Sequence, residues 1–378
     1  MEPKQASHIG LPVNALWTGL LAQLARAVTD ILRFELPWSI WRLLPSSFRL
    51  SCYRRLASYS HRQPFSSITH LPFGLILKEK DEDPHFEANN TQFVATRTNI
   101  PVPRILDVIE FPAADSQPGG IILMNEIEGD SLWEWVIPRI RRVPEAAALI
   151  ARLEACMESN DLDPIMGIAA ELEKMPRPTV DMSDDDPLVM DLRRALNELR
   201  ALAPSSQAVS GLDYLPLFVN RAGEKYFMGP FADQTQFKEA LFRKVSNLFK
   251  YRLPGLRGLA EPVFAKTHRI YFTHADLHHN NILVKDGRLA AILDWEHAGW
   301  YPEYWEHTAM EALTIRTYQM NAFWDQVHLF GEGAYRDELS LEWALWGSTG
   351  LMGVVGEDGD DLGCPRVPPL ASDEKAQS

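Results

Sequence analysis

Three polar side chains in one segment, residues 270–296, have types and a spacing that suit phosphate chemistry. Asp276, Asn281 and Asp294 stand among apolar runs that are compatible with β-strands. An amide oxygen and a carboxylate are hard ligands for Mg²⁺, which keeps its other positions for water and phosphate oxygens. A further carboxylate beside such an ion can accept the proton of an attacking hydroxyl. The pattern therefore predicts Asn281 and Asp294 as metal ligands and Asp276 as a catalytic base.

A tight hairpin is expected to bring the two metal ligands together. Asp286-Gly287 separates two apolar runs, and Asp-Gly is a preferred pair for a two-residue type I′ turn. A turn centred there places Asn281 opposite Ile292, with Asp294 two places further on. Because side chains alternate with period two, both ligands are expected on the same face, about 7 to 8 Å apart between backbones.

Local patterns divide the chain into a small mixed α/β region and a larger helical one. Short apolar runs around one helix predict the mixed region over residues 66–126. Apolar residues at helical spacing predict mainly helices over residues 127–355, which also contain the hairpin. Residues 1–65 are expected to be a helical extension and residues 356–378 a disordered tail. The expected fold class is α+β.

The apolar N-terminal segment, Leu11–Pro45, needs to be distinguished from a membrane span. Arg26, Asp30, Arg33 and Glu35 interrupt it, so no run of about 18 apolar residues remains. We expect an amphipathic helix that packs on the body of the protein, with a helix on a membrane surface as the alternative. No transmembrane segment is predicted.

Composition narrows the classes of partner and compartment. The chain has 378 residues, 46% of them hydrophobic, which is typical of a folded globular protein. Its net charge of −14 offers no general attraction to nucleic acid, so a neutral or cationic small molecule is the expected partner. The three cysteines, Cys52, Cys156 and Cys364, lie far apart in the sequence and suggest a reducing, cytoplasmic environment.

The pattern H-x-D-x-x-x-x-N, followed by a hairpin and D-W-E, resembles the aminoglycoside phosphotransferase and choline kinase family, relatives of the protein kinases. The likeness extends over about residues 66–350. The stretch that begins at Asp294 is similar to the corresponding stretch of fungal phosphotransferase-like proteins. Other stretches with this appearance are Ile100-Pro101-Val102-Pro103, Met124-Asn125-Glu126, Gly229-Pro230-Phe231 and Asp294-Trp295-Glu296-His297-Ala298-Gly299. The resemblance implies a bilobal protein-kinase-like fold, with a small mixed α/β N-lobe and a larger, mainly helical C-lobe. It also implies ATP as the phosphate donor and a hydroxyl of a small molecule as the acceptor.

The same resemblance implies further site residues. Lys78 takes the place of the lysine that holds ATP phosphates, and Glu87 that of the glutamate that positions it. Backbone groups of Glu126 and Ile127 correspond to those that bind adenine. His274 corresponds to the histidine that braces the catalytic loop through hydrogen bonds.

Two alternatives remain open on the sequence. Residues 66–74, before the predicted lysine, contain no G-x-G-x-x-G loop, which is the one feature that favours a catalytically silent kinase-fold binding module. His274, Asp276, His278 and His279 form a string that is also compatible with a two-metal hydrolase, although such a site would leave Asn281 without a role. The sequence predicts neither the identity of the acceptor nor the oligomeric state.

Two features near the motif have simpler explanations. The aromatic residues of the segment 300–305 and the carboxylates around it are compatible with a site for an ammonium-bearing substrate, but core packing is the more economical interpretation. Four aspartates between residues 181 and 186 are expected to form a solvated loop rather than a metal site.

Overall fold

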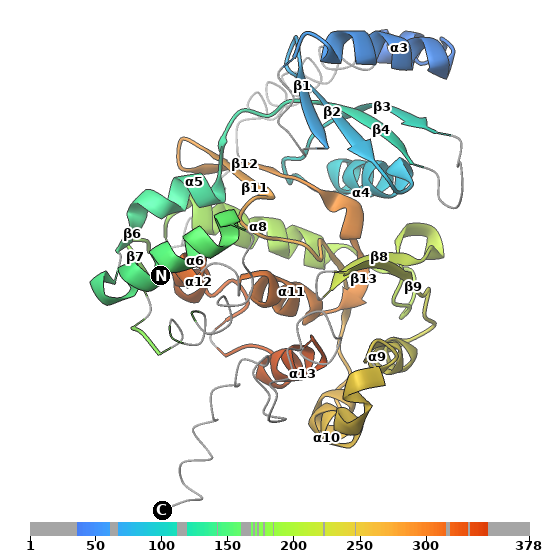
Figure 1. The fold of residues 1–378 in the computed structure, drawn as a ribbon. Coiled ribbons are helices and arrows are strands. Elements are labelled where there is room, and N and C mark those ends of the chain that lie inside the picture. Colours follow the sequence, from blue (N-terminus) through green and yellow to red (C-terminus); the bar gives the residue numbers. More distant parts are fainter. Residues whose placement is uncertain are drawn as a thin grey trace, which may run out of the picture. The chain divides into compact units, whose positions relative to one another are not determined.

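A computed structural model describes residues 36–346, apart from 61–66, 112–118, 142, 160–167, 169–170, 172–173, 177, 184, 222–223, 246, 315–317 and 332. The chain forms two compact units. The first consists of Met1–Pro84 with Ile105–Glu126, and the second of His85–Arg104 with Ile127–Ser378. Figure 1 shows their elements.

The first unit is built on a four-stranded antiparallel sheet in the order β1-β2-β4-β3 (Figure 1). Its elements are α2 (Leu36–Trp41), α3 (Ser46–Ala57), β1 (Ile68–Leu71), β2 (Leu75–Lys80), β3 (Ile105–Glu110) and β4 (Gly120–Asn125). All five apolar residues from Gly120 to Met124 in β4 are buried, as a central strand requires. The sheet and the inner side of α3 share one hydrophobic core, which includes Leu77, Leu123 and Tyr53.

A buried polar network fixes α3 to the sheet. Arg49 and Tyr53 lie one turn apart on the inner face of the helix, and both bind the carboxylate of Asp107 in β3. The Tyr53 hydroxyl donates to Asp107 Oδ2 at 2.6 Å, and burial, together with this bond, raises the pKa of Tyr53. The cation and anion offset each other's cost of burial, so the network is a structural clamp.

The second unit begins with α4 (Pro84–Arg97), whose first residue belongs to the first unit. Its strands are β5 (Asp130–Ser131), β6 (Ile140–Arg141), β7 (Thr179–Val180), β8 (Leu217–Arg221), β9 (Glu224–Met228), β10 (Ile270–Thr273), β11 (Ile282–Lys285), β12 (Arg288–Ile292) and β13 (Gly299–Pro302). Its other helices are α5 (Leu132–Val136), α6 (Ala147–Ser159), α8 (Pro187–Ala201), α9 (Gln234–Phe242), α10 (Leu253–Phe264), α11 (Trp305–Thr314), α12 (Tyr318–Val327) and α13 (Arg336–Trp346).

Helix α8 illustrates how the sequence specifies these elements. Asp186 caps its first turn by accepting a hydrogen bond from the Leu188 N–H at 3.0 Å, and Pro187 follows at the first helical position. Its predicted apolar stripe, Leu192, Leu196 and Leu199, is buried in the largest hydrophobic core described in this unit. The aspartate-rich segment thus ends in a helix cap.

The aromatic residues after the motif form a second core of this unit. Tyr301 and Trp305 stack with their ring centroids 5.2 Å apart and an interplanar angle of 7°. Together with Tyr304, both are almost completely buried. These rings pack in the core, so they leave no cage for an ammonium group.

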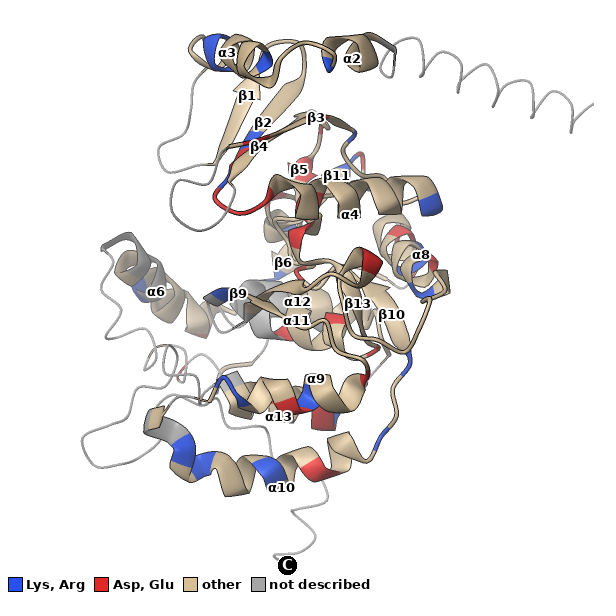
Figure 2. Cartoon of the chain, turned by 90° about the vertical axis from the view of Figure 1, so that its right-hand side faces the viewer, with Lys and Arg blue, Asp and Glu red and all other residues tan. Residues whose placement is uncertain are grey.

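The predicted α+β class, with a sheet-bearing first part and a mainly helical second part, is confirmed. Of the predicted N-terminal extension, the structure describes α2 and α3, while residues 1–35 and the predicted tail lie outside the described residues. No helix among the described residues is long and apolar enough to cross a membrane. Figure 2 shows basic but no acidic residues around α2 and along α3.

Candidate active site

The predicted hairpin forms at the expected turn but with a shifted register. Lys285 pairs with Arg288 across Asp286-Gly287, and both turn residues have positive φ, as a type I′ turn requires. A bulge then occurs between Leu283 and Val284, and Ile282 pairs with Ile292. The prediction that Asn281 lies opposite Ile292 is therefore wrong: the Leu293 N–H donates to the Asn281 carbonyl at 2.8 Å.

Asp294 follows Leu293 directly and does not have the conformation of a strand. Its φ and ψ are both 62°, in the left-handed region that few non-glycine residues adopt. The alternation of side chains along β12 therefore ends before Asp294, so its direction is set by this turn and not by the register. Left-handed aspartates of this kind cluster at functional sites.

His274 connects two segments by hydrogen bonds. One is the loop that carries Asp276, and the other is the end of the strand before Asp294. Its Nε2 lies 2.8 Å from the Leu293 carbonyl, and its Nδ1 accepts the Asp276 N–H at 3.2 Å. This pattern defines a neutral ring protonated at Nε2. Complete burial lowers the pKa of His274 to about 4, although the nearby Asp276 opposes this shift. The histidine is a neutral brace at ordinary pH.

Asn281 holds the side chain of Asp276. Its Nδ2 donates to the Asp276 carbonyl at 2.9 Å and to Asp276 Oδ2 at 3.2 Å. Both bonds use the amide nitrogen, and among the described residues none to the Asn281 oxygen is seen. That oxygen is the atom that a hard metal ion would bind.

Glu306, at the start of α11, binds the backbone of the same loop. Its carboxylate accepts the His274 N–H at 2.7 Å and the Ala275 N–H at 3.2 Å. Ala275 has a φ of 66°, a strained conformation that these bonds stabilise. Burial raises the pKa of Glu306 to about 7, against the effect of the two backbone hydrogen bonds. This residue positions the backbone beside the predicted base.

Three carboxylates of the second unit gather at Asp294. Oxygens of Glu87, Asp294 and Glu296 lie within 4.8 Å of one another. Lys225 in β9 offsets part of this charge, with its Nζ 2.7 Å from Glu296 Oε1. Glu87 and Glu296 are each only 3% exposed, so the cluster forms a buried group of carboxylate oxygens, which are ligands that suit a hard divalent cation.

The remaining predicted residues are divided between the units. Lys78 is buried in β2 of the first unit and Glu87 lies in the second, so their pairing stays a prediction. The Glu126 N–H donates to the Gly74 carbonyl at 2.8 Å. This N–H, one of the backbone groups predicted to bind adenine, is therefore already hydrogen-bonded within the protein. Ile127 begins the second unit, and its predicted role also remains open.

The histidines of the motif do not form a metal-binding cluster. His278 Nε2 lies 3.6 Å from Asp276 Oδ2, while its Nδ1 accepts the Asn280 N–H at 3.2 Å. His279 packs on Trp133, and burial lowers its pKa to about 4. In the part of the chain that the structure describes, no group of three potential ligands contains a histidine of this string. This geometry argues against the two-metal hydrolase.

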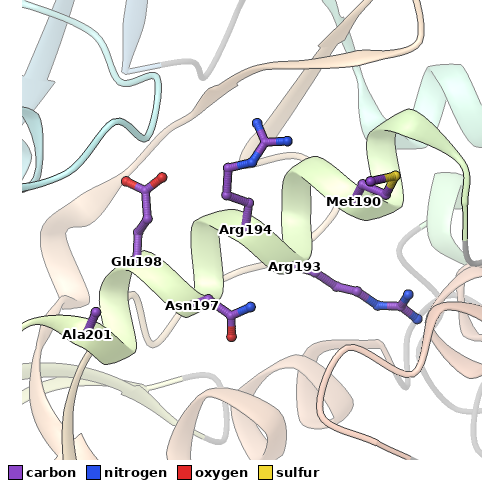
Figure 3. Close-up of a pocket in the computed structure, with 6 residues that line it drawn as sticks. All are labelled: Met190, Arg193, Arg194, Asn197, Glu198 and Ala201. Carbon is purple, nitrogen blue, oxygen red and sulfur yellow. The ribbon is translucent and has the colours of Figure 1, made fainter. Parts of the chain in front are cut away.

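An open hollow of the second unit lies elsewhere, along the outer face of α8 (Figure 3). Its lining residues are Met190, Arg193, Arg194, Asn197, Glu198 and Ala201. None of the predicted site residues contributes to it. Arg194 is engaged by Asp191, with Nη1 3.3 Å from Oδ1. We therefore do not assign the hollow to the catalytic chemistry.

A family model described as a phosphotransferase enzyme family matches residues 75–310, a span that contains every predicted site residue. The chain belongs to this phosphotransferase family. This family agrees with the resemblance carried by the H-x-D-x-x-x-x-N motif. A comparison with curated proteins gave no match.

Several solved phosphotransferases are similar in structure to this family member. An aminoglycoside phosphotransferase, APH(3'')-Id from Streptomyces rimosus, is 14% identical, with 79% of this chain and 98% of that chain covered and a TM-score of 0.41. APH(2")-IIa, in a ternary complex with streptomycin and ATP, is 12% identical, with 84% and 92% covered and a TM-score of 0.42. A macrolide 2'-phosphotransferase from Brachybacterium faecium is 14% identical, with 74% and 81% covered and a TM-score of 0.38.

Two residues of the candidate site were not predicted from the sequence. Glu306 is one of the carboxylates around the aromatic segment 300–305, and nothing local indicated that its side chain binds the loop backbone. Lys225 lies in a hairpin distant in sequence from Glu296, so only the tertiary fold brings them together. A signal for Glu306 was available in its place near the start of a helix whose neighbouring residues are large and apolar.

Proposed function

We propose that this phosphotransferase transfers the terminal phosphate of ATP to a hydroxyl of a small molecule, with Mg²⁺ as cofactor. An amino sugar, an amino alcohol or another hydroxylated metabolite is the proposed acceptor. The observation that carries the proposal is the role of His274, which bonds both the Asp276 amide and the carbonyl next to Asp294. It joins the proposed base and the proposed metal ligand in one rigid arrangement.

In this proposal Asp276 accepts the proton of the acceptor hydroxyl and orients its oxygen for attack. Asn281 fixes the base through its amide nitrogen, and its oxygen is available as a ligand. Glu306 and His274 hold the loop, so that little reorganisation is needed when the hydroxyl arrives.

The donor set fits a hard divalent cation. Asn281 contributes an amide oxygen, and Asp294 a carboxylate that lies in an acidic cluster with Glu87 and Glu296. A bound Mg²⁺ would neutralise charge on the phosphate oxygens. We further propose that Lys78 binds ATP phosphates, that Glu87 positions it and that the backbone near Glu126 and Ile127 binds adenine. The widely spaced cysteines support a cytoplasmic location.

Thermal unfolding with increasing ATP and MgCl₂ separates this enzyme from a silent binding module. A ligand that binds only the folded state at one hundred times its Kd adds about 2.7 kcal/mol of stability, so the melting temperature should rise with concentration. A screen of hydroxylated compounds for ADP release then identifies the acceptor. The proposal would be contradicted if no compound in a broad screen caused ADP release and if ATP with MgCl₂ also gave no thermal shift.

A further inference from the structure

The outer side of α2 and α3 exposes apolar and basic side chains together. We call this set the α2–α3 surface; it consists of Ile40 in α2, Arg42, Leu43 and Leu44 in the turn between the helices, and Phe48 and Arg55 in α3. Leu43 is 83% exposed and Phe48 is 52% exposed. In α3, Phe48 and Arg55 are seven residues apart and so lie on the same face of the helix.

The opposite side of the same helices is fixed to the first unit. Trp38 and Trp41 pack against its core, and Arg49 and Tyr53 bind Asp107. Because the polar clamp and the tryptophans fix the orientation of α2 and α3, the exposed apolar residues cannot turn inward. Their exposure is a property of the folded unit.

The charge of this region is opposite to that of the rest of the chain. Residues 1–57 contain seven Lys or Arg and three Asp or Glu, whereas the whole chain has a net charge of −14. From Leu36 to Ala57 the sequence has four arginines and no acidic residue. Figure 2 shows this local excess of basic residues around α2 and along α3. The partner that such a surface favours is anionic.

We propose that the α2–α3 surface binds an anionic lipid membrane. Leucine, isoleucine and phenylalanine beside arginines on one exposed side of a helical segment are typical of proteins that insert an apolar face into the headgroup region. The arginines would bind lipid phosphates, and an anionic leaflet attracts basic residues that lie close to it. A symmetric contact with a second copy would bring the same arginines together, which disfavours self-association. The proposal does not depend on the catalytic function.

Co-sedimentation with vesicles tests the surface on the full chain. The probe is a vesicle of three parts phosphatidylcholine and one part phosphatidylserine, compared with pure phosphatidylcholine. We expect binding to the anionic vesicles, weak binding to the neutral ones and a large loss at high salt. Leu43→Glu should reduce the partition coefficient by more than about tenfold, and Arg55→Gln by about fivefold.

Matched variants keep the test specific. Leu259→Glu changes a leucine of α10 that is 48% exposed, and this variant should bind like the parent. Arg55→Lys keeps the charge and should also retain binding. Unchanged melting temperatures for Leu43→Glu and Arg55→Gln show that α3 is still docked. The proposal is overturned if the parent does not bind anionic vesicles, if Leu43→Glu binds as well as the parent, or if Leu43→Glu abolishes only a dimer seen by light scattering.

Discussion

Buried charged side chains are arranged differently in the two units. In the first unit, the buried carboxylate of Asp107 meets the Arg49 guanidinium and the Tyr53 hydroxyl, so the charges offset each other. In the second unit, Glu87, Asp294 and Glu296 place three carboxylates together, with Lys225 on one of them. The first arrangement pairs an anion with a cation. The second groups three carboxylate side chains, whose oxygens are the type of ligand that a divalent cation binds.

This difference predicts that polar residues of the first unit act on stability and those of the second on catalysis. Loss of a member of a balanced buried pair leaves an uncompensated charge and is costly to folding. Loss of one proposed catalytic carboxylate instead removes chemistry, with a smaller effect on the folded state. Variants of comparable chemistry in each unit test this division.

The largest expected effect is on turnover. Asp276→Asn removes the proposed base but keeps the size of the side chain, so the rate of phosphate transfer should fall by about 10²- to 10⁴-fold. The control is Asp286→Asn, an equivalent change in the hairpin turn that should retain activity, because Asn-Gly also suits this turn. Steady-state assays of ADP release measure both. A parental rate for Asp276→Asn would show that the base is assigned to the wrong residue.

The next effect is on stability. Asp107→Asn should lower the free energy of unfolding by about 3 to 5 kcal/mol, because Arg49 stays buried without its anion. Urea unfolding measures this loss. The double variant Arg49→Leu with Asp107→Leu should lose less than the sum of the two single changes. If Asp107→Asn lowered turnover per folded molecule instead of stability, the division between the units would not hold.

Stability should also fall in acid through histidines that are buried in the neutral form. Burial lowers the pKa of His307 from 6.5 to about 4. Below pH 6.5 the unfolded chain binds a proton that the folded chain does not, so stability is lost as the pH falls, by about 3 kcal/mol for this group at pH 4. His307→Gln should reduce the slope of unfolding free energy against pH between 6.5 and 4. An unchanged slope would contradict the lowered pKa.

The smallest expected effect concerns the lysine beside the acidic cluster. Lys225→Met removes a positive charge close to Glu296, so Mg²⁺ should bind a few-fold more tightly, with the half-exposed lysine limiting the change. Lys244→Met, in which a lysine over the Tyr226 ring is replaced, is the control. Titration of Mg²⁺, followed by the melting temperature, measures both variants. Weaker Mg²⁺ binding in Lys225→Met would mean that the cluster does not bind the ion.

The sequence was sufficient for much of the fold and for part of the site geometry. Asp286-Gly287 predicted the turn because few residue pairs adopt its positive φ angles. It did not predict the bulge between Leu283 and Val284, since a bulge depends on how the strand packs and not on the local residue types. For the same reason the direction of Asp294, set by its left-handed backbone, was not available from strand alternation.

Contacts between distant segments were the other limit of prediction. The carboxylate of Glu306 reaches the loop at His274 across 32 positions of the chain, and Arg49 reaches Asp107 across 58. Local periodicity carries no information about such pairs. The motif nevertheless placed Asp276 and Asn281 correctly near each other, because only four residues separate them and a loop of that length keeps its ends close.

Calorimetric titration of ATP, with and without MgCl₂, tests the central claim most directly when the parent is compared with Asp294→Asn. We predict that MgCl₂ strengthens ATP binding by the parent and has little effect on binding by Asp294→Asn, with both proteins folded by circular dichroism. An equal effect of MgCl₂ on the two proteins would contradict Asp294 as the metal ligand and, with it, the proposed catalytic arrangement.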